Sequence, residues 1–99
     1  MNRFQCLLCY DVNTSSEGGK RRLRRVAKAC EAYGQRVQWS VFEVSATEVN
    51  FEKLLGRVLK IMDPELDSLR IYRLLGDRER IVTVFGRDRW VDFDGPLII

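Results

Sequence analysis

The chain has 99 residues, 45% of them hydrophobic and 31% charged, with a net charge of +3 and no histidine. This length predicts one domain whose core is only marginally stable on its own. Without histidine, Ser-His-Asp and Cys-His nucleophilic systems are excluded, so any catalysis would rely on carboxylates, tyrosine, lysine or a metal ion. No apolar run approaches the ~20 residues that span a bilayer, and the short N-terminal run does not resemble a secretory signal. We expect a cytoplasmic protein with no membrane association.

The first predicted element is a buried strand over residues 3–10, followed at once by Asp11. Cys6 and Cys9 form a C-x-x-C pair in this strand. Strand positions three apart point to opposite faces, however, and no histidine is present to complete a zinc site. We interpret both thiols as buried and inert. Asp11 is a carboxylate at a strand end, a position from which it could hold a divalent cation next to a bound phosphodiester.

A polar loop over residues 13–19 leads into a helix whose apolar residues recur three and four positions apart. Thr14 and Glu17 have the spacing of a capping box, and Gly34 is expected to stop the helix. Residues 20–28 carry six basic residues and no acidic one, so the remaining chain is net acidic. Arginine dominates this segment and binds phosphate in a bidentate manner, which predicts a local site for a polyanion.

Residues 36–45 have a β pattern whose alternation of apolar side chains breaks near Ser40. A bulge or a tight hairpin there would return both apolar sets to the core, so we expect two short strands. A second amphipathic helix is predicted over residues 51–62, ended by Asp63 and Pro64.

Two further strands are predicted over residues 68–74 and 81–85, and an apolar tail closes the chain at residues 97–99. The order β-α-β-β-α-β with a tail strand is typical of the α+β ferredoxin-like fold, in which both helices cover one face of an antiparallel sheet. We place this domain at residues 1–85 and expect residues 86–99 to pack on a partner subunit.

The uncovered sheet face is expected to form a homodimer. Trp39, Phe42 and Tyr72 are too apolar for open solvent, and we place them on that face. A role for Trp39 and Phe42 in stacking on bases is the alternative, and we favour the core or the dimer interface.

Several segments together carry a family pattern. Residues 37–43, with the sequence Val-Gln-Trp-Ser-Val-Phe-Glu, are highly specific, whereas Tyr10-Asp11-Val12 alone would not be. The other segments are residues 20–28, 30–34 and 67–72. Over nearly its whole length the chain resembles the small CRISPR-associated endonuclease family of spacer acquisition, the second core adaptation protein.

This resemblance implies a homodimer in which a C-terminal strand joins the partner's sheet. It implies that two copies of Asp11 face each other across the two-fold axis and bind Mg²⁺ or Mn²⁺. Family members are described as endonucleases that act on single-stranded RNA or double-stranded DNA. They also bridge two dimers of the adaptation integrase, a role in which nuclease activity can be dispensable.

By the same resemblance, Asp11 is the catalytic residue and the metal ligand. Basic residues would position the nucleic-acid backbone through its phosphates, with little base specificity. These residues are Lys20, Arg21, Arg22 and Arg36. Two aromatic residues, Tyr10 and Phe42, are expected to support the site or the dimer.

Each assignment has a structural alternative. Asp11 could be a turn residue. The basic helix could be a solvated surface, although no acid lies at i+4 to pair with residues 20–25. The acidic residues Asp63, Glu65 and Asp67 are interpreted as a helix-stop turn.

The sequence therefore predicts a metal-dependent endonuclease that acts with the adaptation integrase to acquire spacers. The alternatives are a non-catalytic DNA-binding scaffold for the integrase and a toxin-like ribonuclease on the same fold.

Overall fold

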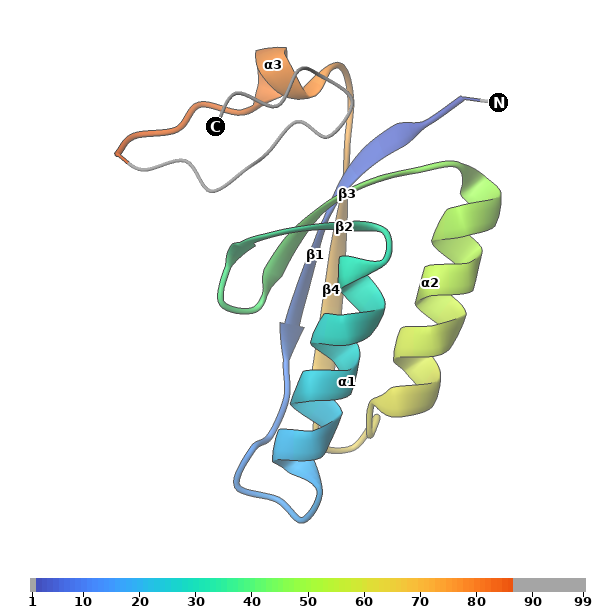
Figure 1. Cartoon of the computed structure of the whole chain (residues 1–99), viewed down its shortest axis with the longest axis vertical. Coiled ribbons are helices and arrows are strands. Elements are labelled where there is room, and N and C mark those ends of the chain that lie inside the picture. Colours follow the sequence, from blue (N-terminus) through green and yellow to red (C-terminus); the bar gives the residue numbers. More distant parts are fainter. Residues whose placement is uncertain (1, 87–99) are drawn as a thin grey trace.

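The computed structural model describes residues 2–86, which form a four-stranded antiparallel sheet with two long helices on one face (Figure 1). The elements are β1 (Phe4–Asp11), α1 (Gly19–Glu31), β2 (Gly34–Gln38), β3 (Val41–Ala46), α2 (Glu48–Ile61), β4 (Ser68–Leu74) and the short α3 (Arg78–Ile81). The strand order is β2-β3-β1-β4. The predicted α+β ferredoxin-like fold is confirmed. Among the described helices, none is long and apolar enough to cross a bilayer.

The core lies between the sheet and the two helices. Alternate residues of β1 point into it, and Leu8 and Phe42 are fully buried there against Val26 of α1 and Leu54 of α2. This alternation separates the two cysteines of β1 as expected. Cys6 is buried, and burial raises its pKa to about 11. The prediction for Cys9 was only half right, because its thiol is partly exposed.

The loop between β1 and α1 differs from the sequence prediction. No capping box forms: α1 begins after Gly18, which has a φ of 75° and makes no side-chain cap. The Asn13 side chain instead accepts hydrogen bonds from the backbone N–H groups of Ser15 and Ser16, each at 3.2 Å. Asparagine commonly bonds the backbone two residues ahead in this way, and here the bond fixes the turn before the helix starts.

Gly34 is not the helix stop that the sequence suggested. The helix ends at Glu31 with Ala32 as its C-cap, and Gly34 is already the first residue of β2. A Cβ atom at Gly34 would lie 2.4 Å from the backbone oxygen of Glu43. The glycine is therefore required by the close approach of β3 rather than by a left-handed turn.

The two predicted strands around Ser40 are confirmed as β2 and β3, with an irregular register between Arg36 and Gln38. The hairpin returns Phe42 to the core but leaves Trp39 at the turn with 75% of its surface exposed. Phe42 takes the core position that was one of its two favoured places, and its placement on the uncovered face was wrong, because β3 presents this residue to the helices. The open face of the sheet carries the residues that alternate with the core residues along each strand. Among them are Leu7, Cys9 and Val41, and Leu7 is paired there with Tyr72 of β4.

The predicted strand over residues 81–85 is also absent. The chain forms the short α3 and then continues without strand structure to residue 86. A strand needs a partner edge, and the turn at Gly76, with a φ of 98°, directs the chain away from β4 (Figure 1). Leu75 and Phe85 are consequently 92% and 93% exposed. The predicted tail strand at residues 97–99 lies outside the described residues.

Candidate functional site

Asp11 is the last residue of β1 and pairs in register with Ser68, the first residue of β4. Its side chain is exposed and, by the alternation of the strand, lies on the open face with Leu7 and Cys9. Among the described residues, none forms a hydrogen bond or ion pair with its carboxylate. An unpaired carboxylate at a strand end is free to receive a ligand.

The carboxylate of Asp11 has the chemistry of a magnesium or manganese ligand, because hard cations prefer oxygen donors. Within residues 2–86, however, no three acidic or cysteine residues gather into a group that could hold a metal ion. Among residues 2–86, Asp11 thus belongs to no group of three metal-binding side chains, and a complete site needs further ligands, such as water, a nucleic acid or a second chain.

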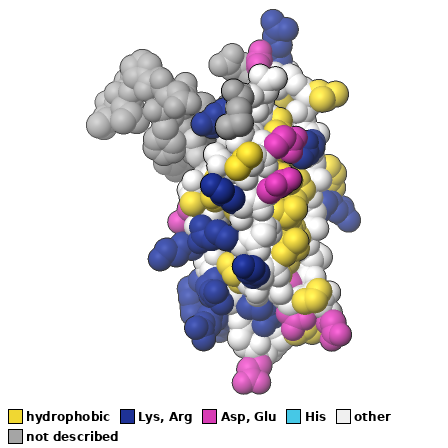
Figure 2. All heavy atoms as spheres, turned by 90° about the vertical axis from the view of Figure 1, so that its right-hand side faces the viewer, with side chains coloured by type: hydrophobic (Ala, Val, Ile, Leu, Met, Phe, Trp, Pro, Cys, Tyr) yellow, Lys and Arg dark blue, Asp and Glu magenta, His cyan; other side chains and the backbone are white. Residues whose placement is uncertain are grey.

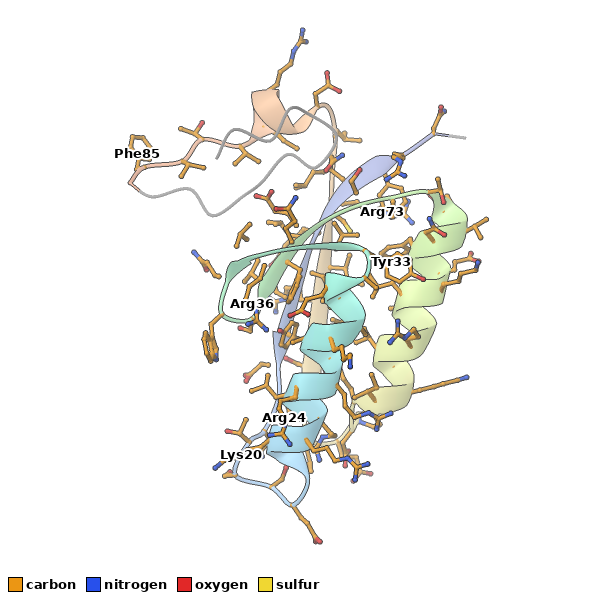
Figure 3. All side chains as sticks on the ribbon, in the orientation of Figure 1. Lys20, Arg24, Tyr33, Arg36, Arg73 and Phe85 are labelled. Carbon is orange, nitrogen blue, oxygen red and sulfur yellow. The ribbon has the colours of Figure 1, made fainter. Side chains whose placement is uncertain are left out.

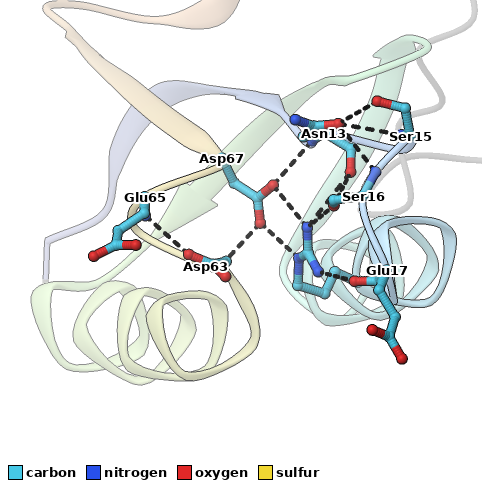
Figure 4. Close-up of polar contacts among 8 residues, drawn as sticks. Asn13, Ser15, Ser16, Glu17, Asp63, Glu65 and Asp67 are labelled. Atoms are coloured by element: carbon cyan, nitrogen blue, oxygen red, sulfur yellow. Dashed lines mark hydrogen bonds and ion pairs between the residues drawn. The ribbon is translucent and has the colours of Figure 1, made fainter.

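A partly buried polar network lies on the loops next to Asp11 (Figure 4). At its centre is Asp67, whose side chain is fully buried with an exposed fraction of 0%. Its carboxylate accepts hydrogen bonds from Arg22 Nε at 2.8 Å and Nη2 at 3.2 Å, and from the backbone N–H groups of Asn13 at 2.9 Å and Asp63 at 2.8 Å. Burial alone would raise the pKa of Asp67, but these donors together lower it below its usual value.

Arg22 is the other half of this network. Besides Asp67, its guanidinium donates to the backbone oxygen of Glu17 at 3.0 Å and to Ser16 Oγ at 2.8 Å. Only 15% of the side chain is exposed. No acid lies at i+4 in the basic helix, as the sequence showed, but Arg22 finds a partner 45 residues along the chain. The predicted contact of Arg22 with nucleic acid stays a prediction, and the observed contacts indicate that it fixes the loop after Asp11.

The acidic group at the end of α2 combines two functions. Asp63 Oδ1 accepts a hydrogen bond from the Glu65 backbone N–H at 2.9 Å, which agrees with the predicted helix-stop turn. Asp67, by contrast, ties the start of β4 to the loop after β1. This role was missed from the sequence, although Asp67 opens one of the segments that carry the family pattern.

The remaining basic residues at the start of α1 are available to solvent. Lys20 and Arg21 are exposed, and neither takes part in a hydrogen bond or ion pair within the described part of the chain. Figure 3 shows Lys20 and Arg24 on the N-terminal half of the helix. Two of the three predicted phosphate-binding residues at this end, Lys20 and Arg21, are therefore accessible to an external anion.

Arg36 lies on β2 above the aromatic residues that were predicted to support the site. Its guanidinium carbon is 5.4 Å from the centre of the Phe42 ring and 5.6 Å from that of Trp39. Tyr10 stacks on Phe42 with ring centres 6.1 Å apart. Burial raises the pKa of Tyr10, and the nearby Arg36 opposes this shift. The stack is thus a cation–π support built inside one chain.

The positions of these residues bear on their predicted roles. Tyr10 and Phe42 are buried in the core of the single chain, so they offer no surface to a dimer partner and can only support the site from within. Arg36 shares the helix side of the sheet with them, whereas Asp11 lies on the open face. The fold therefore does not bring Arg36 and Asp11 together within one chain.

These features define a class of protein: a small ferredoxin-like domain with a basic first helix and one unpaired carboxylate at the end of its first strand. Residues 4–80 match the family described as CRISPR associated protein Cas2. The chain belongs to the Cas2 family.

Relatives and solved structures agree with this membership. The chain is 48% identical over 93 residues to "CRISPR-associated endoribonuclease Cas2 1" of Moorella thermoacetica, covering 94% of this chain and 97% of the relative. It is 53% identical to "CRISPR-associated endoribonuclease Cas2 3" of Rhodospirillum rubrum, covering 94% and 98%. A crystal structure of Streptococcus pyogenes Cas2 at pH 6.5 superimposes with a TM-score of 0.72 at 48% identity, covering 83% of this chain and 99% of that one.

Proposed function

We propose that this chain is a metal-dependent endonuclease-type protein of CRISPR adaptation, which binds nucleic acid and acts with the adaptation integrase to acquire spacers. The observation that carries the proposal is the exposed, unpaired carboxylate of Asp11 at the end of β1. Relatives named as endoribonucleases and as an endonuclease support nuclease chemistry.

A homodimer would supply what one chain lacks. Leu75 and Phe85 expose nearly their whole surface, and Tyr72 exposes 46% on the open sheet face. Such large apolar groups gain free energy when a partner removes them from water. A second chain would also contribute a second Asp11, and two carboxylates can share one cation more easily than they can remain charged side by side.

Asp11 would hold Mg²⁺ or Mn²⁺, which when bound activates water and stabilises charge on a scissile phosphate. The chain's own residues would do the rest. Lys20 and Arg21 would neutralise and orient the backbone phosphates. The Arg22–Asp67 pair would hold the loop after Asp11, so that the carboxylate keeps its place at the strand end.

A non-catalytic scaffold that binds DNA and the integrase is the second candidate. It is favoured by the sparse donor set, since the described residues offer no group of three metal-binding side chains. In such a protein the basic residues would carry the function, and Asp11 would be dispensable.

A cleavage assay separates these two candidates. Single-stranded RNA and duplex DNA are incubated with wild type, Asp11→Asn and the control Glu52→Gln, in Mg²⁺ or Mn²⁺. Glu52 is exposed on α2, and its replacement removes the same unit of charge away from the site. We expect cleavage by wild type and by the control, and its loss in Asp11→Asn without loss of fold. A wild type that binds DNA but cleaves nothing with either metal favours the scaffold instead.

A further inference from the structure

A cleft between α1 and α2 is lined mainly by cations. Arg25 and Lys28 come from α1, and Arg57, Lys60 and Ile61 come from α2. The hollow measures about 230 Å³ and has no acidic residue in its lining. All four basic side chains are exposed. Figure 2 shows the adjoining side of the molecule, where α2 lies, with Lys and Arg side chains gathered toward the lower left.

The side chains of these four cations have no hydrogen-bond or ion-pair partner among the described residues. The helix dipoles favour Lys28 and Lys60, which lie in the last turns of their helices, but they do not account for Arg25 and Arg57. Four like charges around one hollow repel each other, and a bound anion would relieve that repulsion.

The size and lining of the cleft indicate which anion fits. Arginine and lysine are the usual ligands of phosphate. The cleft is lined by no aromatic residue on which a base could stack, so recognition would stop at the phosphate. Arg21, Arg25 and Lys28 follow one another at helical spacing along α1, and this row connects the cleft with the start of the helix.

We propose that the α1–α2 cleft holds phosphates of a nucleic-acid backbone. This inference rests on the proposed function and adds a contact surface to it. The cleft lies on the helix layer, whereas Asp11 lies on the open face of the sheet. The cleft is therefore a holding site, and the phosphates bound there are not those presented to Asp11 of the same chain.

The test compares two double variants that each remove two positive charges. Arg57→Gln/Lys60→Gln alters the cleft, and Arg3→Gln/Arg80→Gln is the control, because Arg3 and Arg80 are exposed and lie outside the cleft lining. Binding of labelled duplex DNA is followed by fluorescence anisotropy over a salt series. We expect the cleft variant to bind roughly tenfold more weakly than the control and to lose up to ~2 from the log–log salt slope, at ~0.9 per phosphate contact.

A second double variant, Arg25→Gln/Lys28→Gln, alters the α1 wall of the cleft. It shows whether weaker binding comes from the cleft itself or from a change in α2 alone. We expect it to behave like the first, with thermal unfolding of both variants close to wild type. Cleft variants that match the control in affinity and in slope would overturn the inference while leaving the proposed function intact. A wild type that binds neither DNA nor RNA would overturn both.

Free polyphosphate has the same chemistry as the nucleic-acid backbone, so calorimetry with tripolyphosphate forms the second arm. Binding of tripolyphosphate that is lost in the cleft variants, together with weakened DNA binding, supports the assignment. If the cleft variants lose tripolyphosphate binding but bind DNA as the control does, the cleft belongs to a free polyphosphate and the nucleic-acid assignment is wrong.

Discussion

The loop end of α1 and the α1–α2 cleft both use residues of the basic run 20–28, but the charges are paired at the loop end and unpaired in the cleft. At the loop end, Arg22 is largely buried, and its guanidinium bonds Asp67, Glu17 and Ser16 of the same chain. In the cleft, Arg25 and Lys28 line a hollow with Arg57 and Lys60, and within residues 2–86 none of these side chains has an ion-pair partner. A paired charge stabilises the fold, whereas an unpaired cluster is available to an external anion. Substitutions at the loop end should therefore change the free energy of unfolding, whereas substitutions in the cleft should change the affinity for nucleic acid.

The largest effect on stability is expected from Asp67→Asn. The change leaves Arg22 without its charged partner. It also replaces one carboxylate oxygen by an NH₂ group, which cannot accept the hydrogen bonds that this oxygen now accepts. Together these losses cost about 2 kcal/mol. Chemical denaturation should show this loss, while Glu65→Gln, an exposed neighbour, should leave the free energy of unfolding nearly unchanged. Equal stabilities of the two variants would mean that the network contributes nothing.

The same pair predicts a dependence on pH. Because the pKa of Asp67 is lower in the folded chain than in the unfolded chain, the stabilisation is fully present above the unfolded value of about 4 and is lost as the pH falls below it. Between about pH 5 and about pH 3, the range in which carboxylates titrate, the free energy of unfolding should fall more for wild type than for Asp67→Asn. Parallel losses in both proteins would assign acid unfolding to other carboxylates.

The next prediction compares the effects of replacing two neighbouring arginines on DNA binding and on stability. Arg21→Gln should weaken DNA binding and lower the log–log salt slope by ~0.9, with little change in stability. Arg22→Gln should lower stability and affect the slope less, because its guanidinium is already occupied. The two variants remove the same charge from adjacent positions, so each is the control for the other. The opposite assignment of effects would show that Arg22 leaves Asp67 to bind phosphate.

The smallest expected effect is a gain in stability. Gly56 lies in the middle of α2, and a Cβ atom there would meet nothing within 4 Å. Gly56→Ala should raise the free energy of unfolding by about 0.5–1 kcal/mol through helix propensity. Because Gly56 adjoins Arg57 without lining the cleft, DNA binding should not change. A loss of binding in this variant would place the nucleic acid directly over α2.

The elements that follow a strong period could be predicted from the sequence. The apolar spacing gave both long helices and β1, and the break at Ser40 gave the hairpin of β2 and β3. Asp11 was also found at the end of its strand, where it is exposed. Local periodicity is sufficient here because each of these features depends on neighbours along the chain.

The features that were missed depend on contacts between distant residues. The pairing of Arg22 with Asp67 spans 45 residues and has no local pattern. The side of the sheet that Phe42 faces depends on which face the helices cover, and alternation alone does not decide it. The predicted strand at residues 81–85 has the right composition, but the turn at Gly76 directs this segment away from the open edge of β4.

Binding of Mn²⁺ to Asp11 tests the central claim most directly, and it does not depend on activity. Water-proton relaxation is measured during titration of wild type, Asp11→Asn and Glu52→Gln with Mn²⁺. If Asp11 holds the ion, wild type and Glu52→Gln should enhance relaxation to the same extent, and Asp11→Asn should lose the enhancement. Equal enhancement in all three proteins would show that the metal is held elsewhere, and the assignment of Asp11 as its ligand would be wrong.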